Sequence, residues 1–179
     1  MTSPPNFAAS LIDAPQRYPR LFDHMARAGW TANRRVDWCG DPEDPSLSIH
    51  LAGFDINDYA DALLDNMQGL VVGRDAYPRR NQFEVATGPR WLGGYDASDS
   101  IYVKELAGVA ELTPVLVCEE TIIWVRPNGT AFSPGPMFQL ALEAETVFLA
   151  MDWLLYREPL PGFDLQPIPA ELRPPGYRE

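Results

Sequence analysis

The residue types that most often carry catalysis or bind metal are sparse in this chain. His24 and His50 are its only histidines, and Cys39 and Cys118 are its only cysteines. A ligand set of these residues with Asp37 can be imagined, but the sequence contains no HExxH, CxxC or HxH pattern that would support it. We therefore expect no metal site, and we expect both cysteines to be reduced core thiols, since free cysteine is usually buried.

Nucleophilic and phosphate chemistry also lack a recognisable motif. The chain has no GxSxG elbow, and no glycine-rich stretch leads into the GK[ST] sequence that cradles a nucleotide phosphate; Lys104 is the only lysine. Adjacent acids such as Glu119 and Glu120 are expected in a chain with 25 acidic residues, and a solvated turn explains this pair better than an acid/base dyad. We expect no catalytic residues and no cofactor; an enzyme with an unrecognised site is our third hypothesis.

The balance of charge favours binding to another macromolecule. Asp and Glu number 25 against 14 Lys and Arg, which gives a formal net charge of -11. Such a charge repels phosphate backbones and attracts basic surfaces, so direct nucleic-acid binding is not expected. The alternative is that the charge serves only to maintain solubility.

Three groups of residues are candidate contacts with a basic partner. One is a set of carboxylates at positions i, i+3 and i+7 of an expected helix, which share one exposed face. The second is an acidic loop, and the third is a glycine pair flanked by two large rings and followed by carboxylates, a combination that suits contact with a basic partner. Burial of the aromatic segment as a loop plug is the alternative. The candidates are Asp58, Asp61 and Asp65 on the helix, Asp41, Glu43 and Asp44 in the loop, and Trp91, Tyr95, Asp96 and Asp99 in and after the aromatic segment.

Two helices are expected in the part of the chain that must position these residues. Pro19 suits the first position of a helix, and Gly29 can take the positive φ that ends it. Asp55 or Asn57 can cap a second helix, which carries the three carboxylates and ends near Gly69.

From residue 70 onward the pattern changes to short strands bounded by turn residues. The turn Arg126-Pro127-Asn128-Gly129 makes the hairpin of residues 121–132 the most clearly specified, because proline and glycine stand where the turn needs their φ angles. A long helix over residues 137–156 is expected to cover the sheet. The expected strands are residues 36–38, 48–52, 70–72, 83–86, 101–105, 115–118, 121–125 and 130–132.

These elements predict one α+β domain, with helices packed against a mostly antiparallel, twisted sheet. We expect a loose N-terminal arm over residues 1–18, in which residues 7–12 can form a short helical turn. The domain is expected over residues 19–157, and an extended proline-rich tail over residues 158–179. No basic segment precedes an apolar run at the N-terminus, and no apolar stretch approaches the roughly 18 residues of a membrane span. We therefore expect a cytoplasmic protein that does not contact membranes.

Several short motifs suggest a family. They are Ala28-Gly29-Trp30, then Arg34-Arg35-Val36-Asp37, then a helix that ends in Met67-Gln68-Gly69-Leu70, followed by the strands, the Gly129 hairpin and a closing helix. This order resembles the SUKH superfamily of bacterial immunity proteins, and its third subgroup in particular, over roughly residues 20–156. The chain departs from the family pattern at Asn33, where glycine often precedes the arginine, and at Gln68, which stands in the usual Gly-Gly pair.

The resemblance implies a SUKH-like fold and a function in toxin immunity. Members of the family bind and neutralise a cognate toxin, commonly a nuclease or a deaminase, that neighbouring cells deliver. The acidity agrees with this, because an enzyme that binds nucleic acid is basic. The second hypothesis is an adaptor or regulator on the same fold that binds a host protein through the aromatic-glycine loop. A toxin gene beside the gene for this protein would favour the first.

Overall fold

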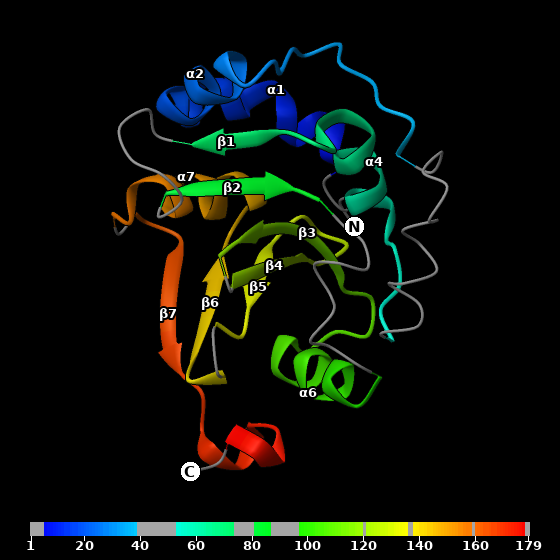
Figure 1. The fold of residues 1–179 in the computed structure, drawn as a ribbon, viewed down its shortest axis with the longest axis vertical. Helices are drawn as coiled ribbons and strands as arrows, with labels where there is room; N and C mark the ends of the chain where they lie inside the picture. The colour runs from blue at the N-terminus through cyan, green and yellow to red at the C-terminus, as the bar shows by residue number, and fades with distance from the viewer. Residues whose placement is uncertain are drawn as a thin grey trace, which may run out of the picture.

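A computed structural model of the protein describes residues 6–38, 53–73, 81–86, 97–119, 121–135, 138–158 and 160–177. Helices α1, α2 and α4 begin the described chain, a run of strands interrupted by α6 follows, and α7 precedes the last strand (Figure 1). The elements are α1 (Phe7–Arg17), α2 (Pro19–Arg27), α4 (Asp58–Met67), β1 (Val71–Gly73), β2 (Gln82–Val85), α6 (Ala97–Ala107), β3 (Thr113–Cys118), β4 (Thr121–Val125), β5 (Ala131–Ser133), β6 (Leu140–Ala144), α7 (Val147–Tyr156) and β7 (Phe163–Pro167). Two short 3-10 turns, Ala170–Leu172 and Pro175–Tyr177, end it.

The described strands form one seven-stranded sheet in which each strand pairs with the next along the chain. Every pairing is antiparallel. The register shifts between Pro114 and Leu116 of β3, and both Val115 and Leu116 are buried, as a β-bulge allows. The sheet with its packed helices confirms the predicted α+β class.

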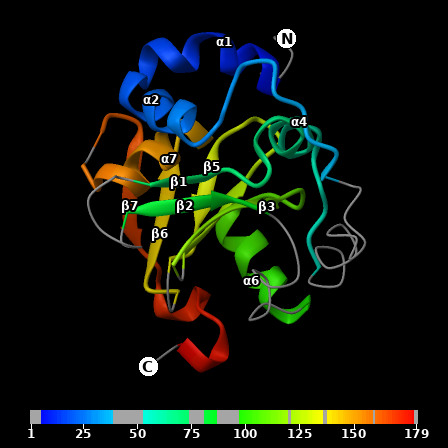
Figure 2. The ribbon, with the colours of Figure 1, turned by 45° about the horizontal axis from the view of Figure 1, so that its top comes forward.

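Helices cover both faces of the sheet. On one face α1, α2, α4 and α7 enclose the larger apolar core, which contains Leu21, Leu63 and Phe148. On the other face α6 covers a smaller core that contains Val103, Trp124 and Phe132. Figures 1 and 2 show α1, α2 and α4 together at one end of the molecule and α6 toward the other.

The β4–β5 hairpin turn is a packing contact as well as a turn. Gly129 has a φ of 82°. A Cβ on this residue would lie 2.5 Å from Cε2 of Tyr59 in α4, so only glycine fits. The sequence predicted this hairpin from its turn residues, and the structure adds that the turn packs against α4.

The predictions for α2 and α4 are confirmed. Pro19 is the first residue of α2, and Gly29, with a φ of 92°, follows its end. Asn57 is the N-cap residue of α4. The N–H of Trp30 donates to the carbonyl of Met25, so the chain turns back on α2 directly after its end.

The predicted loose N-terminal arm is wrong for residues 7–17, which form α1. The side chain of Asn6 accepts a hydrogen bond from the N–H of Ala9 and so caps the helix. Phe7 and Ala14 are buried in the larger core. Pro15 stands inside the helix without ending it before Arg17.

The prediction of a single helix over residues 137–156 is wrong in its first half. Residues 140–144 form β6, and Thr146 caps a shorter α7 by accepting from the N–H of Leu149. The extended tail is also wrong in part, because residues 163–167 pair with β6 as strand β7. The prolines did not prevent this, since Pro167 is the last residue of a strand at the edge of the sheet.

Two of the other predicted strands are also wrong. Residues 101–105 lie within α6, where Val103 and Ala107 face the smaller core one helical turn apart. Residues 36–38 form no strand, although the N–H of Val36 donates to the carbonyl of Asp65. The strand predicted at residues 48–52 lies outside the described residues. Within the described ranges, no helix combines the length and apolar character needed to cross a membrane.

Candidate acidic binding surface

Helix α4 carries the predicted row of carboxylates. Asp58, Asp61 and Asp65 are all exposed on its outer side, and its opposite side is buried against the sheet. Within the described part of the chain no ion pair involves any of the three. Carboxylates at this spacing repel one another, so the helix holds a concentrated negative charge at the surface.

A buried polar network holds the N-terminus of α4 to the sheet. The Oδ1 atom of Asn57 accepts from the N–H of Ala60 at 3.0 Å, and its Nδ2 atom donates to the carbonyl of Val125 at 2.9 Å and to Oγ1 of Thr113 at 3.1 Å. The Thr113 hydroxyl in turn donates to the carbonyl of Asp55 at 2.7 Å. The helix start is therefore fastened to both β3 and β4.

A second network holds the C-terminus of α4. The guanidinium of Arg34 donates to the carbonyls of Asn66 and Gln68, each at 2.8 Å. The Asn66 side chain donates to the carbonyl of Arg34 at 2.8 Å and accepts from the indole N–H of Trp30 at 2.9 Å. Three of the motifs that carry the family resemblance thus meet here, through Trp30, Arg34 and Gln68, and they fasten the end of the acidic helix.

Burial and the repulsion among the three carboxylates both affect the pKa of Asp61. Partial burial raises the pKa of Asp61 above its ordinary value, and the charges of Asp65 and Asp58 raise it further. The indole of Trp38 opposes this shift, but its N–H lacks the geometry of a hydrogen bond. A cation placed beside the row would relieve the repulsion among the three carboxylates.

Of the remaining candidate residues the structure describes Asp99, which it does not bring to α4. Asp99 lies half-buried on the first turn of α6, over the other face of the sheet. Six candidates lie outside the described residues, so their contribution stays a prediction: Asp41, Glu43, Asp44, Trp91, Tyr95 and Asp96. Cys39 also lies outside the described residues, so its expected burial stays a prediction. The alternative that the aromatic segment is buried as a loop plug is untested for the same reason.

A groove beside the row was not predicted from the sequence. Two hollows lie between α1 and α4, and Phe7, Ala8 and Ala62 line both. The assignment of residues 1–18 to a loose arm concealed this groove. The available signal was a cap at Asn6 followed by apolar residues at Phe7, Leu11 and Ala14, the spacing of one helical face.

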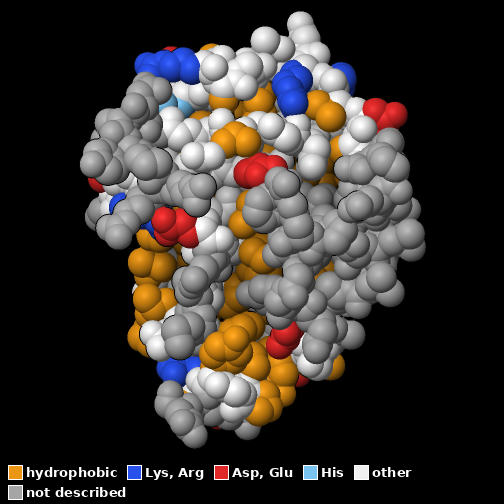
Figure 3. Space-filling model, in the orientation of Figure 1, with side chains coloured by type: hydrophobic (Ala, Val, Ile, Leu, Met, Phe, Trp, Pro, Cys, Tyr) orange, Lys and Arg blue, Asp and Glu red, His pale blue; other side chains and the backbone are white. Residues whose placement is uncertain are grey.

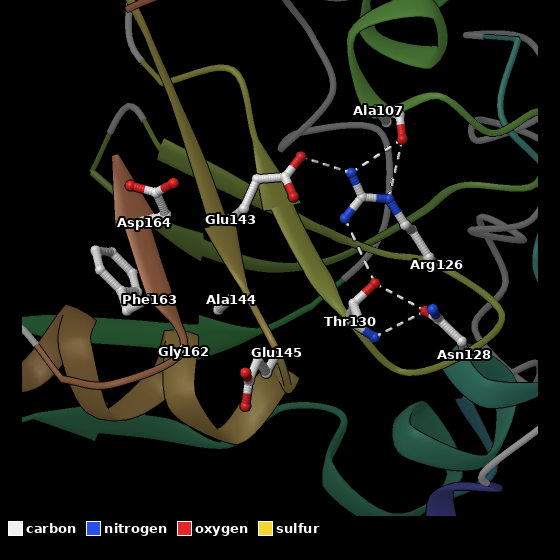
Figure 4. Close-up of a pocket in the computed structure, with 10 residues that line it drawn as sticks. All are labelled: Ala107, Arg126, Asn128, Thr130, Glu143, Ala144, Glu145, Gly162, Phe163 and Asp164. Carbon is white, nitrogen blue, oxygen red and sulfur yellow. Dashed lines mark hydrogen bonds and ion pairs between the residues drawn. The ribbon is translucent and has the colours of Figure 1, made fainter. Parts of the chain in front are cut away.

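A polar hollow of about 680 Å³, lined by residues of the β4–β5 turn and of β6 and β7, has the features of a structural site (Figure 4). The guanidinium of Arg126 donates twice to the carbonyl of Ala107, pairs with Glu143 at 2.9 Å, and donates to Oγ1 of Thr130. Its hydrogen-bonding groups are therefore used within the protein, where they fasten the end of α6. No histidine, cysteine or serine belongs to the described lining.

Two other groups that could carry chemistry, the Cys118 thiol and the Lys104 ammonium, face the interior or bond within the protein. Cys118 is a free, buried thiol, as predicted, and burial raises its pKa. The ammonium of Lys104 donates to the carbonyl of Gly53 and so ties α6 to the preceding segment. In the part of the chain that the structure describes, no three His, Cys, Asp or Glu side chains come together to hold a metal ion.

An exposed apolar surface lies on the edge strand β7 and its neighbour β6, where Figure 3 shows apolar side chains. Leu140 and Leu165 are each almost half exposed. The hydrogen bonds on either side of β7 imply that the N–H of Leu165 faces outward, and Pro167 has no N–H to offer. A strand added at this edge would find few donors, so the edge is protected against pairing.

Comparison with protein-family models, curated proteins and solved structures found no match for this chain. The relation to the SUKH superfamily therefore stays a prediction from the motifs named above.

Proposed function

We propose that this protein is an immunity protein that binds and neutralises a basic toxin through the outer side of α4. The observation that carries the proposal is the row Asp58, Asp61 and Asp65, exposed on a helix that is fastened at both ends. Because the helix is held in place, a partner meets carboxylates whose positions are set before it binds, which lowers the entropic penalty of association.

The charge of the whole chain supports the same kind of partner. A net charge of -11 attracts a basic protein from a distance and increases the rate at which the two meet. Nucleases and nucleic-acid deaminases are basic where they bind their substrate, so an acidic protein can occupy that surface. The motifs that resemble those of SUKH immunity proteins support the choice of a toxin, and two of them, at Trp30 and Arg34, hold the end of α4 in place.

The test is capture of the partner from the native host, followed by kinetics with a charge-reversed variant. Each Asp-to-Lys change adds two charges, so Asp58→Lys, Asp61→Lys and Asp65→Lys together change the net charge from -11 to -5. The matched control reverses three exposed acids away from α4, Glu105, Asp164 and Glu171, and gives the same net charge. We expect the α4 variant to associate about tenfold more slowly at low salt, and the control to change much less.

A second measurement tests neutralisation itself. The captured partner should stop the growth of a bacterial host when expressed alone, and co-expression of this protein should restore growth. Association that is unchanged in the α4 variant and independent of salt would refute the acidic interface. A partner that is harmless when expressed alone would favour the adaptor hypothesis.

A further inference from the structure

The groove between α1 and α4 has two hollows of different character. The hollow at the N-terminal end of α4, about 670 Å³, is bordered by Asp58 and Glu111. The hollow at its C-terminal end, about 480 Å³, is lined mainly by apolar side chains, with Asp65 and Arg35 at its border. We call these the N-terminal and C-terminal hollows. They adjoin at Ala62, the small residue on α4 that lines both.

The apolar lining of the C-terminal hollow is open to solvent. Ile12 of α1 is 71% exposed, the most exposed large apolar side chain among the described residues. Leu11, Pro15 and Trp30 line the same hollow. A single exposed isoleucine has no special meaning, but one at the border of an apolar hollow adds contact area for an apolar side chain of a partner. Figure 3 shows apolar side chains between charged ones at the end of the molecule formed by α1, α2 and α4.

The carboxylates define what kind of segment fits. Asp58 and Asp65 are seven residues apart on α4, which is about 10 Å along the helix axis. A second helix lying in the groove would span that distance in about two turns, with basic side chains at positions i and i+7 and apolar side chains between them. An acidic segment would be repelled by Asp58 and Asp65, and Asp61 adds a third negative charge near both.

The walls of the groove are held in place before any partner binds. The ring of Phe7 contacts Tyr59 of α4 edge-on, with ring centroids 5.7 Å apart, and also contacts Phe148 of α7 at 6.1 Å. These contacts fasten α1 to the core, and the two polar networks fasten α4. Little of the protein needs to become ordered when a segment enters, which favours binding.

We propose that the α1/α4 groove binds a basic amphipathic helix of the partner, with an apolar side chain in the C-terminal hollow and basic side chains beside Asp58 and Asp65. The proposal rests on the proposed function, since it names the part of the basic partner that α4 receives. It adds a source of specificity, because charge alone attracts many basic proteins and an apolar hollow selects among them.

Three synthetic helical peptides test the groove directly by fluorescence anisotropy. The first has leucines along one side and lysines elsewhere, the second replaces the leucines with serine, and the third replaces the lysines with glutamate. We expect the lysine/leucine peptide to bind at least about tenfold more tightly than the lysine/serine peptide, the effect of burying about one leucine. The glutamate/leucine peptide should not bind.

Variants of the protein locate the site. Ile12→Ser removes an apolar contact at the border, and Ala62→Phe places a ring where the two hollows adjoin. Each should weaken binding of the lysine/leucine peptide about tenfold. The matched control is Ile101→Ser, which removes an exposed isoleucine from α6 on the other face of the sheet and should leave binding unchanged. Far-UV circular dichroism verifies that each variant is folded.

The results separate this proposal from the proposed function. Equal affinity for the lysine/leucine and lysine/serine peptides, or affinities within twofold in Ile12→Ser and Ala62→Phe, would overturn the groove proposal. The acidic interface would still stand if charge reversal on α4 slowed association with the captured partner. Unchanged association in that variant would reject the interface whatever the peptides do.

Discussion

Replacing Asn57 with alanine removes the side chain that caps α4 and fastens it to the sheet. The loss of the cap to Ala60 corresponds to about 1 kcal/mol. The buried carbonyl of Val125 loses a donor, and an unsatisfied buried group costs about 1–3 kcal/mol. The Thr113 hydroxyl keeps a donor, the backbone N–H of residue 57. We therefore expect a total loss of about 2–4 kcal/mol, a large part of the roughly 5–15 kcal/mol that stabilises a typical domain.

Urea unfolding followed by circular dichroism measures this loss. Asn128→Ala is the matched control, because the Asn128 side chain accepts hydrogen bonds from Thr130 in an exposed turn and its loss should cost less than about 1 kcal/mol. A loss for Asn57→Ala within about 0.5 kcal/mol of the control would refute the reasoning. Thr113→Val extends the test: the two residues share hydrogen bonds, so the double variant should lose less than the sum of the single ones.

Two further changes test other charged groups by the same urea measurement. Arg20→Met leaves the carboxylate of Asp152, whose side chain is 2% exposed, without its ion-pair partner at 2.7 Å. Since Arg20 is itself partly exposed, we expect a loss of about 1–3 kcal/mol, and Asp152→Asn in the same chain should recover part of it. A full loss in the double variant would contradict this. Asp61→Asn should stabilise the protein slightly at neutral pH, because the raised pKa of Asp61 means that the folded state holds this proton more tightly than the unfolded state. The gain should disappear as the pH falls through that raised pKa, and a variant less stable than the wild type at pH 7 would contradict the sign.

Local signals in the sequence predicted the elements whose ends depend on neighbouring residues. Asn57 caps α4, Pro19 begins α2, and the turn that contains Gly129 joins β4 to β5. A cap, a positive φ or a proline ring acts within about four residues, so the chemistry that decides these positions is present in the sequence itself.

The elements that were predicted wrongly depend on residues far away in the chain. Strand β7 exists because β6 offers it a partner, and Pro167 is tolerated because no other strand of the described residues pairs with β7. In α6 the β-branched residues Ile101 and Val103 favoured a strand, but the smaller core requires Val103 and Ala107 one helical turn apart. Tertiary packing overrides weak local preference in such segments.

The same division holds for the candidate binding surface. The spacing of Asp58, Asp61 and Asp65 placed three carboxylates on one side of a helix, because helical periodicity is a local property. The sequence alone thus determined the sign and the position of that charge along the chain. Only the tertiary structure placed α1 beside α4 and so formed the groove. The two helices are far apart in the sequence and meet because they pack on a shared core, so no local pattern predicts their contact.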